Sequence, residues 1–320
     1  MTIAIKISSL LKIHIKMNKT IRNLIAAIAI AVPLLSPCPA NAQDQIVIDP
    51  LFEYPTAPEE MTSLQDKSNY LVEHFWDKMD FKTKTTVDQN ALNDAVRVYS
   101  VPMRWADKSK AIAATDKLIS TISKNPTLLI QFTKAAEESM YGPRADVWID
   151  EVYMRFLDAI VKNKKVPEAR KKRYERQLSV LSKSALGNKA PEFKFTTTDG
   201  KEATYFPMTT VTMIIFGDPS QPDWRLARMK METNMRLKQA VDKGKVNMLY
   251  IVNTDNPKWK SEVSNYPSNW TIGIATDAGE TYDFRTAPSL YVIDKEGKII
   301  LKNATPESAV WEVLKQTEDK

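Results

Sequence analysis

The chain has 320 residues, enough for two domains of ordinary size, and its 43% apolar and 26% charged residues are the balance of a folded globular protein. One cysteine and two histidines exclude a disulfide framework, a C-x-x-C redox pair and a Cys/His metal site. No glycine-rich phosphate-binding pattern occurs among the eight glycines, and nothing else in the sequence calls for a cofactor or a metal.

Residues 1–42 are predicted to be a signal peptide. An apolar run from Leu24 to Leu35, too short to span a bilayer, precedes the small-residue cleavage pattern at 40–42. We expect the mature chain to begin at Gln43, to be periplasmic or secreted, and to have no transmembrane segment. Because Met17 would begin a leader of normal length, translation of residues 1–16 stays open. The segment has no acidic residue and five basic ones, Lys6, Lys12, Lys16, Lys19 and Arg22.

Cys38 offers an alternative, a lipid anchor, but Pro37 fits that signal poorly and the Ala-Asn-Ala site at 40–42 fits cleavage better. Ordinary secretion is therefore favoured, and it leaves the mature chain without a thiol. Cleavage also removes five of the 45 basic residues, leaving 40 against 39 acidic ones. The formal charge of +6 belongs mostly to the leader, so nucleic acid is not an expected partner.

Residues 43–186 keep apolar side chains at helical spacing and predict an all-α domain of five or six helices. Asn125-Pro126 and Gly142-Pro143 mark places where helices stop and start, and Pro167 opens a last helix through Leu181. We place Trp148 on the same apolar stripe as Val152.

Residues 187–320 predict an α/β domain with a mixed sheet, so the whole chain is an α+β two-domain protein. We expect one helix from Arg225 to Val241, a short helix from 257 to 263, and a last helix capped by Thr305. Five strands are expected, over residues 211–216, 246–252, 270–275, 289–293 and 298–301.

Four short motifs in order carry a family resemblance. Gly187-Asn188-Lys189-Ala190-Pro191-Glu192-Phe193 and the Asp199-Gly200 turn precede a strand that ends in Phe216-Gly217-Asp218-Pro219. Thr286-Ala287-Pro288 follows further along the chain. This order resembles the thioredoxin-like domains of bacterial envelope thiol–disulfide oxidoreductases, and residues 70–77 resemble a helical domain of unknown function found before such domains. The resemblance implies a thioredoxin-like fold for 187–320 and a cis-proline loop at Pro288.

The resemblance also shows what is missing. A thioredoxin site needs a thiolate at a helix N-terminus and a second cysteine three residues later. The corresponding positions hold Gln221 and Trp224, so we expect no redox activity and no catalytic residue.

The binding half of the site remains a hypothesis. We expect a groove for an extended peptide segment of another envelope protein, with Trp224 either facing the groove or packed on the sheet. Its residues are Asp218, Pro219, Pro222, Asp223, Thr286, Ala287 and Pro288. Two rivals stay open, a thiol–disulfide oxidoreductase of the cell envelope and a scaffold for the helical domain.

Other residues favour structural roles. His74 has no metal-ligating partner in the sequence, and Asp223 suits the first turn of a helix better than a carboxylate pair with Asp218. Trp259 and Trp270 are either core residues or the lining of a ligand surface. A basic run from Lys162 to Arg176 is either a solvated helix face or a docking surface for an acidic partner or phospholipid headgroups.

Overall fold

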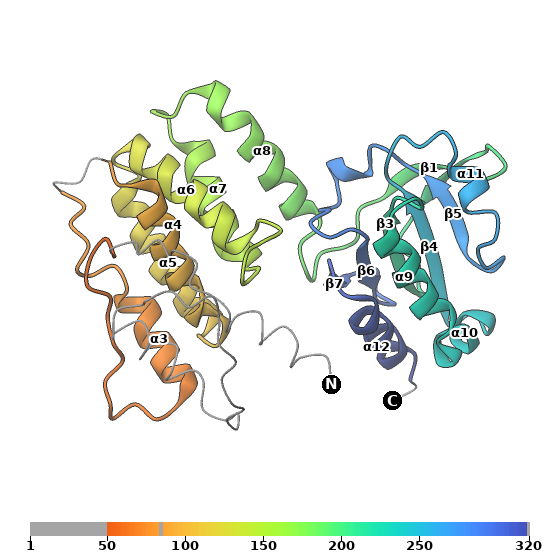
Figure 1. Cartoon of the computed structure of the whole chain (residues 1–320), viewed down its shortest axis with the longest axis horizontal. Coiled ribbons are helices and arrows are strands. Elements are labelled where there is room, and N and C mark those ends of the chain that lie inside the picture. Colours follow the sequence, from red (N-terminus) through yellow and green to blue (C-terminus); the bar gives the residue numbers. More distant parts are fainter. Residues whose placement is uncertain (1–49, 83–85, 319–320) are drawn as a thin grey trace, which may run out of the picture. The chain divides into compact units, whose positions relative to one another are not determined.

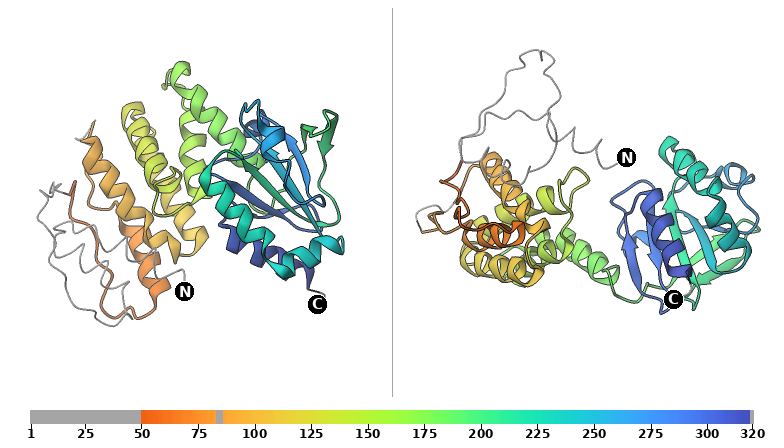
Figure 2. Two further views of the ribbon diagram at one scale, coloured as in Figure 1. Left: turned by 45° about the vertical axis from the view of Figure 1, so that its right-hand side comes forward. Right: turned by 90° about the horizontal axis from the view of Figure 1, so that it is seen from below.

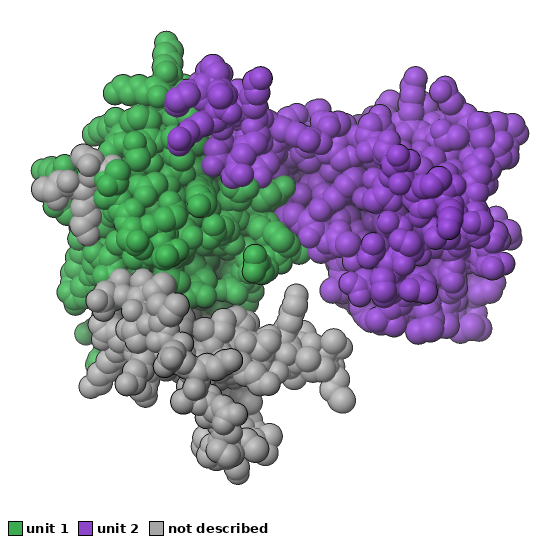
Figure 3. All heavy atoms as spheres, turned by 45° about the horizontal axis from the view of Figure 1, so that its top comes forward, with its two compact units in different colours: residues 1–166 green, residues 167–320 purple. Residues whose placement is uncertain are grey.

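The computed structural model describes residues 50–82 and 86–318; the predicted leader, with Cys38 and Gln43, lies outside this part. The chain divides into two compact units, residues 1–166 and 167–320 (Figure 3). The predicted boundary at residues 186 and 187 lies one helix further along the chain. In the described residues, no helix is both long enough and apolar enough to cross a bilayer.

The described part of the first unit is helical, as the apolar spacing predicts (Figure 1). Side-chain caps start three of its helices: Ser63 accepts from the Asp66 amide, Asp88 from the Ala91 amide and Asn125 from the Thr127 amide. The helices are α3 (Leu64–His74), α4 (Gln89–Ser100), the 3-10 turn η1 (Pro102–Arg104), α5 (Lys108–Ile122), α6 (Pro126–Met140) and α7 (Asp150–Lys162).

An aromatic cluster forms part of the core of this helical unit. The centroid of the Trp76 ring lies 5.4 Å from the centroid of the Tyr99 ring and 5.2 Å from that of the Phe132 ring. Phe75 lies 4.8 Å from Trp76 and is also buried. Trp148 differs from the prediction: it precedes α7 and is exposed, and its indole N–H donates to the Gly142 carbonyl.

The second unit begins with α8 (Glu168–Lys183) and continues into a mixed seven-stranded sheet of order β2-β1-β5-β4-β3-β6-β7. Strands β3, β4 and β5 run parallel, and the remaining neighbours are antiparallel. The strands are β1 (Phe193–Thr197), β2 (Glu202–Tyr205), β3 (Val211–Gly217), β4 (Val246–Val252), β5 (Thr271–Ile274), β6 (Ser289–Ile293) and β7 (Ile299–Lys302).

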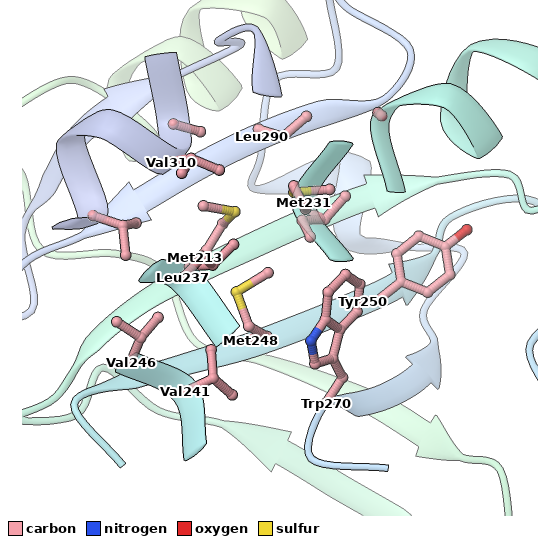
Figure 4. Close-up of a cluster of buried hydrophobic side chains, with 14 of the residues drawn as sticks. Met213, Met231, Leu237, Val241, Val246, Met248, Tyr250, Trp270, Leu290 and Val310 are labelled. Carbon is pink, nitrogen blue, oxygen red and sulfur yellow. The ribbon is translucent and has the colours of Figure 1, made fainter. Parts of the chain in front are cut away.

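Two hydrophobic cores lie on opposite faces of this sheet, because successive side chains of a strand point to opposite sides. In β3, Met213 and Ile215 join the core beneath α9 (Pro222–Glu232), α10 (Met235–Asp242) and α12 (Pro306–Thr317), which Figure 4 shows in part. Ile214 and Phe216 join the other core with Tyr282. Strand β3 is therefore buried on both faces, which explains its unbroken apolar run.

The structure corrects two sequence expectations. The helix expected from Arg225 to Val241 is two helices, because the chain breaks at Thr233 and the Asn234 side chain accepts from the Leu237 amide to start α10. Strands β1 and β2 were not expected, since they are short and mix apolar with polar residues. The smaller elements are α11 (Trp259–Glu262) and the 3-10 turn η2 (Ala278–Glu280).

Candidate functional site

The carboxyl end of β3 leads directly into α9, the arrangement that places a reactive group at a helix N-terminus in thioredoxin-like proteins. The Gln221 amide donates to the Asp218 carbonyl at 3.1 Å, closing a turn after Gly217. Gln221 then stands at the N-cap in an extended conformation, and Pro222 is the first helical residue, where its missing N–H costs nothing. Gln221, Pro222 and Asp223 are all exposed.

Asp218 stabilises this turn as a hydrogen-bond acceptor. Its Oδ1 accepts from the Ser220 amide at 2.9 Å, the Ser220 hydroxyl at 2.8 Å and the Asn256 amide nitrogen at 3.4 Å. Burial raises the pKa of this carboxyl group, but these hydrogen bonds more than offset the burial and hold the pKa below its usual value. Asp218 is thus an ionised structural group, and Asp223 lies in the first turn of α9, where its charge favours the helix dipole.

Trp224 is buried, with only 1% of its surface exposed. Its indole stacks on the Tyr250 ring at a centroid distance of 4.3 Å and an interplanar angle of 6°. The indole N–H donates to the Tyr266 hydroxyl at 2.5 Å, so its one polar atom is also satisfied. The sequence left open whether this ring faces the groove or packs on the sheet. In the structure it packs on the sheet and presents no face to a ligand.

The loop at Pro288 lies against the end of β3. Phe216 pairs with Ser289 across the β3–β6 ladder, and a methyl group on Gly217 would come within 3.3 Å of the Pro288 Cβ. The Ala287–Pro288 peptide bond is cis. Ala287 is exposed and lies outside the helices and strands. Among the described residues, its backbone makes no hydrogen bond to another backbone group.

The structure therefore brings the predicted residues of the groove to one end of the sheet. Gln221, Pro222 and Asp223 are exposed at the start of α9, and Ala287 is exposed in the loop beside Gly217. Thr286 and Pro288 are half-buried; the Ser289 hydroxyl donates to the Thr286 carbonyl at 2.6 Å. Pro219 is buried.

A surface hollow of about 280 Å³ lies on the α11 side of this helix start. Sequence reasoning missed it, although two arginines three residues apart on one helix face were the available signal. The Arg228 guanidinium lies 4.2 Å from the centre of the Tyr266 ring and 3.4 Å from Glu232, so the protein already holds it. The lining residues are Pro219, Ser220, Arg225, Arg228, Glu262 and Tyr266.

These groups have a limited chemistry. The hollow offers guanidinium and carboxylate groups, and the exposed turn offers amides; neither contains a thiol, and Cys38 is the single cysteine of the sequence. Among residues 50–82 and 86–318, no group of three or more histidine and carboxylate side chains could hold a metal ion. The arrangement is suited to contact and hydrogen bonding.

The other candidate residues have structural partners. Trp259 and Trp270 are buried in the core beneath α9 and α10. His74 is half-exposed, with its Nδ1 2.7 Å from an Asp77 carboxylate oxygen. In the basic run, Lys171 is buried and pairs with Glu168 at 2.7 Å, and Arg176 pairs with Glu280 at 2.7 Å.

The second part of the chain has a thioredoxin-like fold. A solved structure described as a thioredoxin-like protein from Bacteroides caccae matches with a TM-score of 0.72 at 21% identity, covering 83% of this chain and 99% of that one. A shorter match is the thioredoxin domain of a thiol-disulfide oxidoreductase from Bacteroides vulgatus, with a TM-score of 0.37 at 17% identity, covering 42% of this chain and 99% of that one.

A match over the first half of the chain shows its family. Residues 16–184, just over half of the sequence, match the family described as "Domain of unknown function (DUF5106)". The chain belongs to this family. No curated protein matches it.

Proposed function

We propose that this chain is an exported protein whose thioredoxin-like part binds an extended segment of another envelope protein without thiol chemistry. The observation that carries the proposal is the fate of the two cysteine positions. Gln221 is an exposed N-cap and Trp224 is buried in the core, while the loop at Ala287 next to them stays exposed.

The loss of thiol chemistry follows from the side chains. Exchange begins with attack by a thiolate on a disulfide sulfur, and neither an amide nor an indole can make that attack. Burial of Trp224 against Tyr250 also means that this position serves the core. The enzymatic rival therefore lacks its reactive group at both positions.

The capacity to bind rests on backbone groups. A peptide that adds to a strand edge is held mainly by main-chain hydrogen bonds, which do not depend on a cysteine. Ala287 is exposed and offers one N–H and one carbonyl for this, and the turn that leads to Gln221 and Asp223 starts at Gly217, against Pro288. The partner we propose is an extended segment with polar side chains facing Gln221.

Site-specific photo-crosslinking tests this proposal in the producing cell. A photoreactive residue at exposed position 221 should give adducts with another envelope protein, whereas the same residue at exposed Lys295 should not, because Lys295 follows the other end of β6. The variant Ala287→Trp should remove the adducts at 221 by covering the loop. Equal adducts at 221 and 295, or adducts that survive Ala287→Trp, would contradict the proposal.

Export and domain division are further parts of the proposal. The basic and apolar pattern of residues 1–42 supports a signal peptide, and sequencing the amino terminus of the exported protein should begin at Gln43. We keep 43–186 as the helical domain and 187–320 as the thioredoxin-like domain. The family match to residue 184 supports this division, although α8 contacts η2 through Arg176 and Glu280.

A further inference from the structure

The three helices that cover one face of the sheet carry exposed apolar side chains on their outer surface. Single exposed apolar residues are common, but a group of large ones on adjoining helices marks an interaction surface. The exposed fraction is 49% for Leu226 and 54% for Met229 on α9, 69% for Met235 at the start of α10, and 62% for Trp311 on α12. We call these four residues the apolar strip.

Two ion pairs place the strip along the line where these helices meet. Lys230 on α9 lies 2.6 Å from Glu307 on α12, and Arg236 on α10 lies 2.8 Å from Glu318, just after α12. Helices α9, α10 and α12 also pack against one another, as Figure 2 shows from two sides.

The four apolar residues lie on the outer side of these helices. Leu226 lies one turn before Lys230 on the same side of α9, and Met229 lies one turn after Leu226. Met235 is the first residue of α10 and is exposed. Trp311 lies one turn after Glu307, with the Lys315 ammonium 5.0 Å from its ring centre.

The charges beside the strip indicate its occupant. The α9–α10 side contributes two cations, Lys230 and Arg236, and the α12 side contributes two anions, Glu307 and Glu318, so these charges cancel. Lys315 is likewise matched by Glu312 at 3.8 Å. An anionic lipid surface, or a partner of one charge sign, gains no net attraction from such a face.

A second copy of the chain does gain from it. The cations lie on the α9–α10 side of the line where the helices meet, the anions lie on the α12 side, and the two members of each ion pair lie at the same height along it. A two-fold axis along this line therefore places each cation opposite the matching anion of the other copy. The same operation brings the two apolar strips together. We propose that the apolar strip is a contact surface through which two copies of this chain associate.

This dimer is small and reversible. Stable complexes bury about 800 Å² on each partner, and four partly exposed side chains around a polar margin lie at the lower end of that scale. Trp311 is its anchor, because large aromatic side chains at the centre of an interface carry most of the binding energy. Association therefore depends on concentration and on Trp311.

Sedimentation of the purified protein over a range of concentrations tests the dimer. The sedimenting mass should rise from that of one chain toward twice that value, and Trp311→Ser should keep it at one chain. Phe206→Ser is the matched control, because Phe206 is 54% exposed and follows β2, outside the three helices that carry the strip. A wild-type protein that stays monomeric, or a Phe206→Ser variant that dissociates as much as Trp311→Ser, would overturn the proposal.

Charge exchange tests the two-fold arrangement itself. The double variant Lys230→Glu, Arg236→Glu makes the face acidic, and Glu307→Lys, Glu318→Lys makes it basic. Each should be monomeric alone, and an equimolar mixture should form a dimer. Association of either variant alone, or no association in the mixture, contradicts the arrangement. Binding of a monomeric wild-type protein to vesicles of anionic phospholipid, lost in Trp311→Ser, would assign the strip to a membrane surface instead.

Discussion

Trp224 is the residue that the family resemblance aligns with the second cysteine of a thioredoxin-like enzyme, and its surroundings explain why it is a core residue. It packs on Tyr250 with nearly parallel rings and gives its N–H to the Tyr266 hydroxyl, which in turn lies under Arg228. The sequence shows the loss of the cysteine but not this destination, because Tyr250 and Tyr266 follow Trp224 by 26 and 42 positions and meet it only in the fold.

Replacement of Trp224 should therefore affect stability. We expect Trp224→Ala to lower the free energy of unfolding by about 3–5 kcal/mol, the usual result of removing a large buried side chain. Trp224→Phe keeps part of the ring contact and should cost less. Urea unfolding measures both, with Gln221→Ala as the control at an exposed position of the same turn. A Trp224→Ala variant as stable as Gln221→Ala would show that the ring is not packed as described.

Asp218 should make stability depend on pH. Its pKa in the folded protein lies below that of the unfolded chain, since hydrogen bonds from Ser220 and Asn256 outweigh burial. The unfolded state therefore binds protons at a higher pH than the folded state. The contribution of Asp218 is present above the unfolded pKa of about 3.9 and is lost as the pH falls through the lower folded value.

The variant Asp218→Asn isolates this contribution. It should be less stable than the wild-type protein at pH 7, and the difference should shrink as the pH falls below about 4. Chemical unfolding at a series of pH values measures it. A stability difference that does not change between pH 7 and the acid range would contradict the role given to this carboxylate.

At the scale of elements, apolar spacing predicts the helices of residues 64–183 and strands β3, β4 and β6 well, because these elements bury runs of apolar residues. Strands β1 and β2 escape prediction, since they mix apolar with polar residues and gain their stability from pairing. The break between α9 and α10 is also missed, because apolar residues continue on both sides of Thr233-Asn234.

Asn234 is the residue that separates these two helices. Its side chain accepts from the Leu237 amide at 3.0 Å, so Asn234→Ala should lower the free energy of unfolding by about 1 kcal/mol. Asn234→Asp keeps an acceptor at the N-cap and should retain most of the stability. Thermal unfolding of the two variants measures the cap, and equal losses in both would contradict it.

At the scale of the whole molecule, the chain joins a helical part of the DUF5106 family to a thioredoxin-like part without thiols. The short motifs around Pro191, Gly217 and Pro288 predicted the second fold through their resemblance to thioredoxin-like domains. The hollow beside Arg228 and the apolar strip were not predicted, since both combine side chains from separate helices and loops, and only the two arginines of the hollow share one helix face.

We propose that this thioredoxin-like protein works without thiol chemistry. The direct measurement is the rate at which the purified protein accelerates reduction of insulin disulfides by dithiothreitol, with an active thioredoxin as the positive control. We expect the uncatalysed rate for the full-length chain and for its Cys38→Ser variant, which removes the single cysteine of the sequence. Acceleration above that rate that persists in Cys38→Ser would contradict the claim.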